Sequence, residues 1–184
     1  EGQTDSQVEF LARGQGYTLF LKPTEAVLAL TRASADQRHP DLAPATDGLI
    51  KSSEPNAEPP TVVRMRLVGA NASANVTGHD QLPGKTNYFI GNDPGNWQTN
   101  VSTYAKVSYE DVYPGIDLVY YGAQGQLEYD FIVAPGADPD NIALSIAGAD
   151  SLRLDQDGNL VLSFEDGALA WQAPFIYQEA DGLK

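Results

Sequence analysis

The stretch VYPGIDLVYYGAQGQLEYDFIVAP, from Val112 to Pro135, decides the fold class. It holds two apolar, aromatic-rich runs, Ile116–Tyr121 and Gln126–Val133, on either side of a short connection that begins and ends with glycine. The second run alternates between an apolar set (Leu127, Tyr129, Phe131 and Val133) and an acidic set (Glu128 and Asp130). A period of two with a glycine-bounded connection predicts a β-hairpin with one buried face, in which Tyr129 and Phe131 are buried.

Upstream of this hairpin, further short apolar runs are separated by turn residues. Val8–Leu11, Tyr17–Leu21 and Ala26–Leu30 predict an antiparallel meander, although Thr24 could instead cap a helix over Glu25–Arg32. The other predicted strands are Thr61–Val68, Tyr88–Ile90, Tyr104–Tyr109, Ile142–Ile146, Leu152–Leu154, Leu160–Phe164, Ala168–Trp171 and Phe175–Tyr177, with turns at Asp157-Gly158 and Asp166-Gly167. Short strands at this spacing predict an all-β fold, an antiparallel β-sandwich or an open barrel.

The segment Thr31–Pro60 differs from the rest of the chain, because it is rich in proline, alanine and acidic residues and poor in large apolar ones. Such a segment cannot bury enough surface to offset its ordering entropy, so we expect a long, mobile surface loop. A domain boundary there is the alternative, but the part upstream is too short for a core of its own. We therefore expect residues 1–184 to form a single β-rich domain.

The composition excludes several classes of function. The formal net charge of −14 repels phosphate backbones, so we expect no nucleic-acid partner. The chain has no cysteine, which excludes disulfides, thiolate nucleophiles and Cys-type zinc sites. No apolar run is long enough to span a bilayer, so we expect no membrane insertion.

Charged residues suggest one specific pairing. On the predicted strand Thr61–Val68, Arg64 and Arg66 alternate with apolar residues and therefore share a face. In so acidic a chain they should have carboxylate partners. Glu128 and Asp130, on the polar face of the hairpin, are the predicted partners.

Two segments resemble ligand-binding loops but lack essential parts. Gly84-Lys85-Thr86 is similar to the end of a phosphate-binding P-loop, but the preceding glycine is misplaced and no strand-to-helix context follows. Asp155–Asn159 carries oxygen ligands at alternate positions, as a calcium loop does, but lacks the later bidentate glutamate. A polar hairpin turn is the favoured interpretation of this second segment, and we expect no cofactor or metal.

The sequence also lacks a catalytic signature. Asp117, Glu128 and Asp130 could pair for glycoside hydrolysis, but they alternate with core positions as solvent-facing strand residues do. His39 and His79 are the only histidines and suggest neither a zinc site nor a Ser-His-Asp triad. We therefore expect a protein that is not an enzyme.

Aromatic residues are the candidate contacts for a ligand or a partner. Core packing is the favoured role for most of the tyrosines between positions 104 and 121, whereas Trp97 directly follows a loop and should be exposed. The candidates for contact are Trp97, Tyr113, Tyr120 and Tyr121. In addition, Asn71, Asn75 and Asn100 begin Asn-X-Ser/Thr glycosylation patterns.

The segments LARGQGYTLFL, LPGKTNYFIGNDPGNW, YPGIDLVYYG and QLEYDFIVAPGADP resemble a known family. It is the N-terminal β-rich domain of unknown function that precedes the repeats of bacterial SBBP (seven-bladed β-propeller) repeat proteins. The likeness runs from about Gln3 to Tyr177 outside the Pro-rich loop and is most specific over Tyr113–Pro139. It implies an extracellular, non-catalytic module of a surface protein and supplies no catalytic or ligand residues.

Three hypotheses for the function follow. The first is a structural or adhesive extracellular β-module that assembles with itself, the second a carbohydrate-binding module, and the third a glycan-active enzyme. Members of the resembling family continue past the segment matching Phe175–Gly182, whereas this sequence stops at Lys184. Either the remainder is missing, or the chain ends early and leaves an unfilled place in its sheet. In the latter case Gln7–Ala12 could add to a neighbour's edge and form filaments, with Val8 and Phe10 filling pockets.

Overall fold

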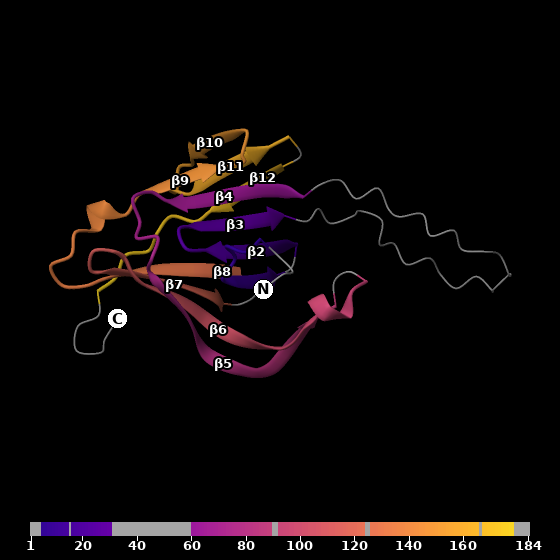
Figure 1. Cartoon of the computed structure of the whole chain (residues 1–184). Coiled ribbons are helices and arrows are strands. Elements are labelled where there is room, and N and C mark those ends of the chain that lie inside the picture. Colours follow the sequence, from indigo (N-terminus) through magenta and orange to yellow (C-terminus); the bar gives the residue numbers. More distant parts are fainter. Residues whose placement is uncertain are drawn as a thin grey trace. The chain divides into compact units, whose positions relative to one another are not determined.

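The computed structural model describes residues 5–14, 16–30, 60–89, 92–123, 126–165 and 167–178. Its strands are β1 (Phe10–Gly14), β2 (Tyr17–Lys22), β3 (Glu25–Leu30), β4 (Thr61–Leu67), β5 (Asn75–Tyr88), β6 (Gln98–Tyr113), β7 (Ile116–Ala123), β8 (Gln126–Val133), β9 (Leu144–Ala147), β10 (Ser151–Leu154), β11 (Leu160–Phe164) and β12 (Gly167–Trp171). Two short 3-10 helices, η1 (Pro94–Asn96) and η2 (Pro139–Asn141), complete the described elements (Figure 1).

The structure confirms the all-β fold class, with antiparallel sheets and no closed barrel among the described strands. Two compact units can be distinguished along the chain, Glu1–Ser145 and Ile146–Lys184. The predicted loop over Thr31–Pro60 lies outside the described residues, apart from Pro60 at its end.

The first unit contains strands β1 to β4 of a sheet in the order β1-β2-β3-β4-β9, and β9 spans the boundary between the two units. The predicted meander is confirmed, and the helical alternative over Glu25–Arg32 is wrong for its described part, because Glu25–Leu30 is strand β3. This strand is hydrogen-bonded to β2 on one side and β4 on the other. Its alanine and leucine residues favour helix locally, but pairing on both edges and burial of Ala26 and Val27 override that preference.

The second sheet of this unit has the order β5-β6-β7-β8. It contains the predicted hairpin, in which β7 and β8 pair over eight consecutive positions from Ile116↔Val133 to Ala123↔Gln126. The inner side chains of β7 (Ile116, Leu118 and Tyr120) are buried. By contrast, Tyr129 and Phe131 on β8 are only half-buried, because β8 is the edge strand. The prediction was therefore correct for which face of the hairpin points inward, but it overestimated how deeply Tyr129 and Phe131 are buried.

The two sheets face one another across a shared apolar core. The Tyr109 hydroxyl donates to the carbonyl oxygen of Lys22 at 3.0 Å, and the Tyr113 hydroxyl donates to the carbonyl oxygen of Ala143 at 3.0 Å. The buried apolar side chains from the first sheet are Leu19, Leu21, Ala26, Val27, Val63, Met65 and Leu67, and those from the second are Tyr109, Val112, Tyr113, Ile116, Leu118 and Tyr120. This two-layer arrangement is that of a β-sandwich.

Strands β5 and β6 are much longer than predicted. Tyr88 of the predicted strand Tyr88–Ile90 is the last residue of β5, and the predicted strand Tyr104–Tyr109 is only part of β6, because glycine and polar residues conceal the strand pattern. The pairing of β6 with its neighbours is interrupted by register shifts. Asp80, Asn100 and Asp111 have left-handed backbone conformations, with φ of 53°, 59° and 49°, and lie at or beside these shifts. Such β-bulges bend a ribbon and increase its twist.

The second unit contains the sheet β10-β11-β12. The predicted turn at Asp157-Gly158 joins β10 to β11: the Asp155 carboxylate accepts from the backbone N–H groups of Asp157 and Asn159, both at 2.9 Å. The strands β11 and β12 pair as predicted, although Asp166 in their connection lies outside the described residues. The predicted strand Phe175–Tyr177 is wrong, because residues 172–178 form an exposed coil and pair with no described strand.

Candidate functional site

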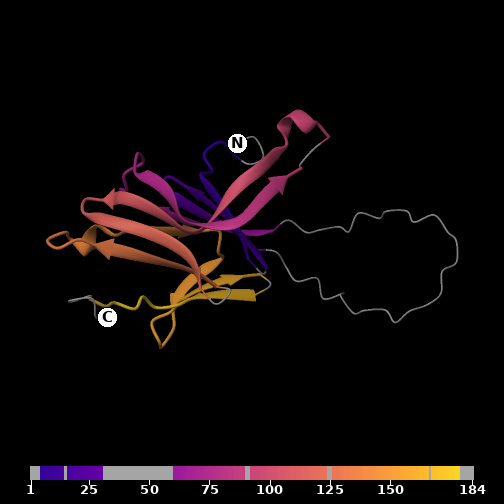
Figure 2. The same ribbon diagram turned by 90° about the horizontal axis from the view of Figure 1, so that it is seen from below.

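The distal half of the β5–β6 hairpin extends beyond the four-stranded sheet (Figure 2). Strand β7 pairs with β6 only from Lys106 to Tyr113, so the part of β6 before Lys106 pairs with β5 alone. We call this part, residues 81–89 and 92–105 with η1 at its end, the distal ribbon. It is a two-stranded structure, and such ribbons lack the second layer that would bury one face.

Large apolar side chains are exposed along the distal ribbon. They are Leu82, Phe89, Trp97, Val101 and Tyr104. At the tip, Phe89 is 60% exposed and Trp97 is 38% exposed. Their rings meet edge to face, with centroids 5.2 Å apart. The Asp93 carboxylate accepts from the N–H of Gly95 at 2.9 Å and thereby caps η1, which fixes the loop that precedes Trp97.

Strand β1 holds the ribbon through two aromatic contacts. Phe10 meets Tyr104 edge to face at 6.0 Å, and the Arg13 guanidinium lies 5.7 Å from the Tyr88 ring centroid. The Tyr104 ring lies against Gly78, where an added Cβ would come within 2.6 Å of the ring. The ribbon is therefore attached to the sandwich by side chains as well as by its own strands.

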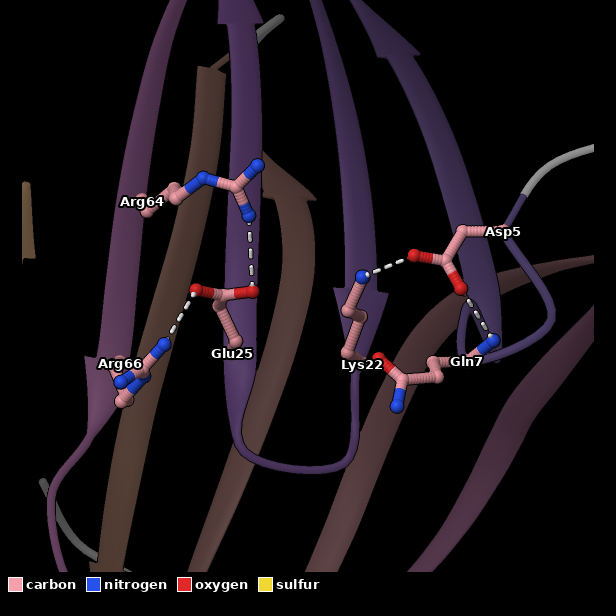
Figure 3. Close-up of polar contacts among 6 residues, drawn as sticks. All are labelled: Asp5, Gln7, Lys22, Glu25, Arg64 and Arg66. Carbon is pink, nitrogen blue, oxygen red and sulfur yellow. Dashed lines mark hydrogen bonds and ion pairs between the residues drawn. The ribbon is translucent and has the colours of Figure 1, made fainter. Parts of the chain in front are cut away.

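A row of charged side chains lies on the outer face of the first sheet (Figure 3). Glu25 on β3 accepts a hydrogen bond from Arg64 of β4 at 3.2 Å and forms an ion pair with Arg66 of the same strand at 3.6 Å. The predicted pairing of these arginines with Glu128 or Asp130 is therefore wrong. The register places Glu25 directly opposite Arg66 on the neighbouring strand, so the partner is local to the first sheet.

A second ion pair in the same row joins Lys22 to Asp5 at 2.7 Å. The Lys22 ammonium, with the N–H of Gln7, lowers the pKa of Asp5. The contact ties the start of the described chain to β2. Each of the three ion-pair contacts in this row includes an exposed side chain, and ion pairs at the surface stabilise a fold only weakly.

The four aromatic candidates for contact occupy different environments. Tyr113 and Tyr120 are buried and fill the core, so neither offers an exposed ring. Tyr121 is half-buried and donates to the Asp130 carboxylate at 2.9 Å. Partial burial, followed by this carboxylate, raises the pKa of Tyr121. Of the four, Trp97 is the one in the distal ribbon.

Most of the candidate catalytic groups form hydrogen bonds within the fold. Asp117 accepts from the N–H of Asp111 at 2.7 Å, and Asp130 accepts from Tyr121, while Glu128 is exposed. His79 makes a 2.6 Å hydrogen bond between its Nε2 and the Ser108 hydroxyl. Among the described residues, no three His, Cys, Asp or Glu side chains gather where they could hold a metal ion. His39 lies outside the described residues.

The two loop-like motifs are structural parts of strands and turns. Gly84-Lys85-Thr86 lies within β5, where the Gly84 carbonyl accepts from the Thr103 hydroxyl at 2.9 Å. Asp155 closes the β10–β11 turn, and hydrogen bonding from Asn159 lowers its pKa. The interpretation of Asp155–Asn159 as a polar hairpin turn is confirmed.

The candidate strand-addition residues lie at the edge of the first sheet. Phe10 is in β1 and pairs with Leu21 of β2, and the N–H of Glu9 donates to the carbonyl of Leu21 at 2.9 Å. Val8 is half-buried beside them. This segment therefore pairs within its own sheet, and its role in strand addition stays a prediction.

The sequence did not reveal Phe89, Leu82 and Val101 as members of the site. Leu82 and Val101 are isolated among polar residues, glycine and proline, whereas Phe89 lies in the short predicted strand Tyr88–Ile90, where it has no sign of exposure. Trp97 could be identified because a tryptophan after a polar turn is unusual.

Comparison with known proteins places the whole chain in one family. A family model described as a domain of unknown function, DUF7948, matches residues 1–184. No curated protein and no solved structure matches the chain significantly. Among the described residues, no helix is long and apolar enough to cross a membrane. Because this family model matches the full sequence, the chain belongs to the DUF7948 family of domains of unknown function.

Proposed function

We propose that this chain is a non-catalytic structural or adhesive β-module of an extracellular bacterial surface protein, and that it assembles with itself through exposed sheet edges. The observation that carries the proposal is the set of large apolar side chains exposed on the distal ribbon, with Phe89 and Trp97 at its tip. Exposed apolar surface of this kind marks a contact with another molecule. A projecting ribbon presents it without disturbing the sandwich.

The resemblance to the domain that precedes the repeats of SBBP proteins supports the extracellular location. A module in a long surface chain needs contacts and stability rather than a catalytic centre. The net charge of −14 keeps such a module soluble and apart from other acidic surfaces until specific contacts form. Asn71, Asn75 and Asn100, the glycosylation candidates, are all exposed.

A carbohydrate-binding module is the second candidate function. The Phe89–Trp97 pair favours it, because exposed aromatic rings stack on the apolar faces of sugars. The polar side chains of Asn92 and Thr99, exposed near the pair in the chain, could hydrogen-bond sugar hydroxyls. In this case the ribbon tip would be the binding site, while the sheet edges would play no part.

Sedimentation velocity and electron microscopy of the full chain over a concentration series test the first proposal. We expect species larger than a monomer whose share rises with concentration. A chain that stays monomeric throughout would contradict self-assembly. A glycan array with the full chain and its Phe89→Ser/Trp97→Ser variant tests the second candidate, which requires binding by the full chain and loss of binding by the variant.

A further inference from the structure

Strand β8 is an edge strand with only part of the usual protection against pairing. Edge strands in natural proteins commonly carry charged side chains, proline or a bulge that prevents another strand from adding, and of these β8 has only Glu128 and Asp130. Strand β8 has neither lysine nor proline, and it pairs with β7 in an uninterrupted register. Among the described strands, none lies on its other side. Its outer edge can therefore accept one more strand.

The inner face of the sheet carries an aromatic row that ends at this edge. Tyr109 meets Tyr120 at 5.9 Å, Tyr120 meets Tyr129 at 5.8 Å, and Tyr129 meets Phe131 at 6.0 Å. The first two tyrosines are buried, whereas Tyr129 and Phe131 are only half-buried. On the opposite face of β8, Ile132 is 54% exposed. An added strand would cover the end of the row on one face and Ile132 on the other.

The chain also holds a segment with the matching pattern. Phe175 is 86% exposed and Ile176 is 89% exposed, in a coil that follows β12 and appears in Figure 2 as the yellow segment before the C-terminal label. The rings of Phe175 and Tyr177 stack with centroids 6.0 Å apart and an interplanar angle of 28°. Side chains two positions apart share a side in an extended backbone, so the stacking of Phe175 on Tyr177 favours an extended shape for this coil.

We propose that residues 174–178 of one copy add as a strand to the outer edge of β8 in a second copy. Phe175 and Tyr177 extend the aromatic row beside Phe131, and Ile176 lies opposite Ile132. The inference rests on the proposed self-assembly and names its two surfaces. Because the donor and acceptor surfaces differ, the contact is heterologous, and its repetition produces either a closed ring or an open-ended chain of copies.

Charge determines when this contact forms. The donor segment Gln172–Gln178 has no charged residue, so it does not meet Glu128 and Asp130 of the acceptor strand with like charge. The two whole chains repel one another, since each carries −14. Salt screens that repulsion, whereas the apolar contact does not depend on it, so assembly should strengthen as salt is added.

Cysteine cross-linking tests the contact directly, because the native chain has no cysteine. One chain carries Ile132→Cys and the other Ile176→Cys, and they are mixed under mild oxidation. Directly opposed residues on neighbouring strands lie about 4.5–5.5 Å apart between Cα atoms, within disulfide reach. We expect a disulfide-linked heterodimer. The control replaces Ile132→Cys with Val68→Cys in the turn after β4, which is exposed and lies on neither of the proposed surfaces, and should give no such product.

A second pair of variants tests the assembly itself. Ile176→Pro removes a backbone N–H and should abolish the large species while the melting temperature is unchanged, since the segment is in no described sheet. Ile176→Val should retain them. If the native chain assembles but Ile176→Pro also assembles and no heterodimer forms, this inference is overturned and the proposed module survives. If the native chain does not assemble, the self-assembly proposal fails as well. A disulfide within one chain carrying both cysteines, without dimers, would also overturn it.

Discussion

Strand β6 passes through two environments, and the contrast between them is instructive. Its later part, with Tyr109, Val112 and Tyr113, is buried between two sheets. Its earlier part, with Val101 and Tyr104, is exposed in the distal ribbon. The residue types are similar in the two parts. The difference is the presence of a facing sheet, so burial here depends on the second layer and not on local strand propensity.

The largest expected effect tests the covered part. Leu118, which is fully buried on β7, loses its packing when it is changed to alanine. We expect Leu118→Ala to lower the free energy of unfolding by about 2–5 kcal/mol, measured by urea denaturation. Val101→Ala on the distal ribbon is the matched control and should change it by about 0.5 kcal/mol or less. Equal losses would show that the ribbon is packed as tightly as the core.

Phe131 gives an intermediate case. Full burial of its ring would predict a loss of about 3–5 kcal/mol for Phe131→Ala. Because the side chain is half-buried at the edge of the sheet, we expect a loss below this range. The same denaturation measurement decides, with Leu118→Ala as the reference. If Phe131→Ala lowers the free energy of unfolding of the isolated monomer by as much as full burial predicts, then the edge of the sheet at β8 is covered in the monomer.

The stability of the protein at alkaline pH tests the burial of the core tyrosines. Burial raises the pKa of Tyr109 and of Tyr120 well above the ordinary value for tyrosine. A tyrosine whose pKa is raised in the folded state contributes to stability in full below its pKa in the unfolded chain, which is about 10. This contribution is lost as the pH rises from that value toward the pKa of the folded state. We therefore expect stability to fall above about pH 10. Tyr109→Phe should weaken that fall; an unchanged pH profile would contradict the assignment.

The smallest effect concerns the charged row on the first sheet. Glu25→Gln removes the carboxylate that contacts Arg64 and Arg66, whose side chains are exposed. We expect a loss of about 0.2–1 kcal/mol that diminishes in high salt. Asp80→Asn, which breaks the exposed pair with Lys106 on the other sheet, is the matched control. A loss that is independent of salt would indicate that packing of the Glu25 stem, not its charge, is responsible.

Patterns within short segments predicted the fold class correctly and the site only in part. The period of two over Leu127–Val133 is a local property, so the hairpin and its inner face could be read directly. Pairing between distant segments could not. Glu25 lies far from Arg64 in sequence, and only the order of β3 and β4 brings them together. Likewise, the polar sequence of β5 becomes a strand because β6 supplies hydrogen bonds, which no local pattern records.

The left-handed residues Asp80, Asn100 and Asp111 have a consequence for how this family can vary in length. At Asp111 the unusual backbone is held by a hydrogen bond from its N–H to Asp117. Inserting a single residue elsewhere in a strand reverses the face of every side chain beyond it. At a bulge the register is already shifted, so one residue can be gained or lost locally. Insertions and deletions among DUF7948 sequences should therefore concentrate at these three positions. The length of the distal ribbon should then vary more among family members than the lengths of the strands in the sandwich.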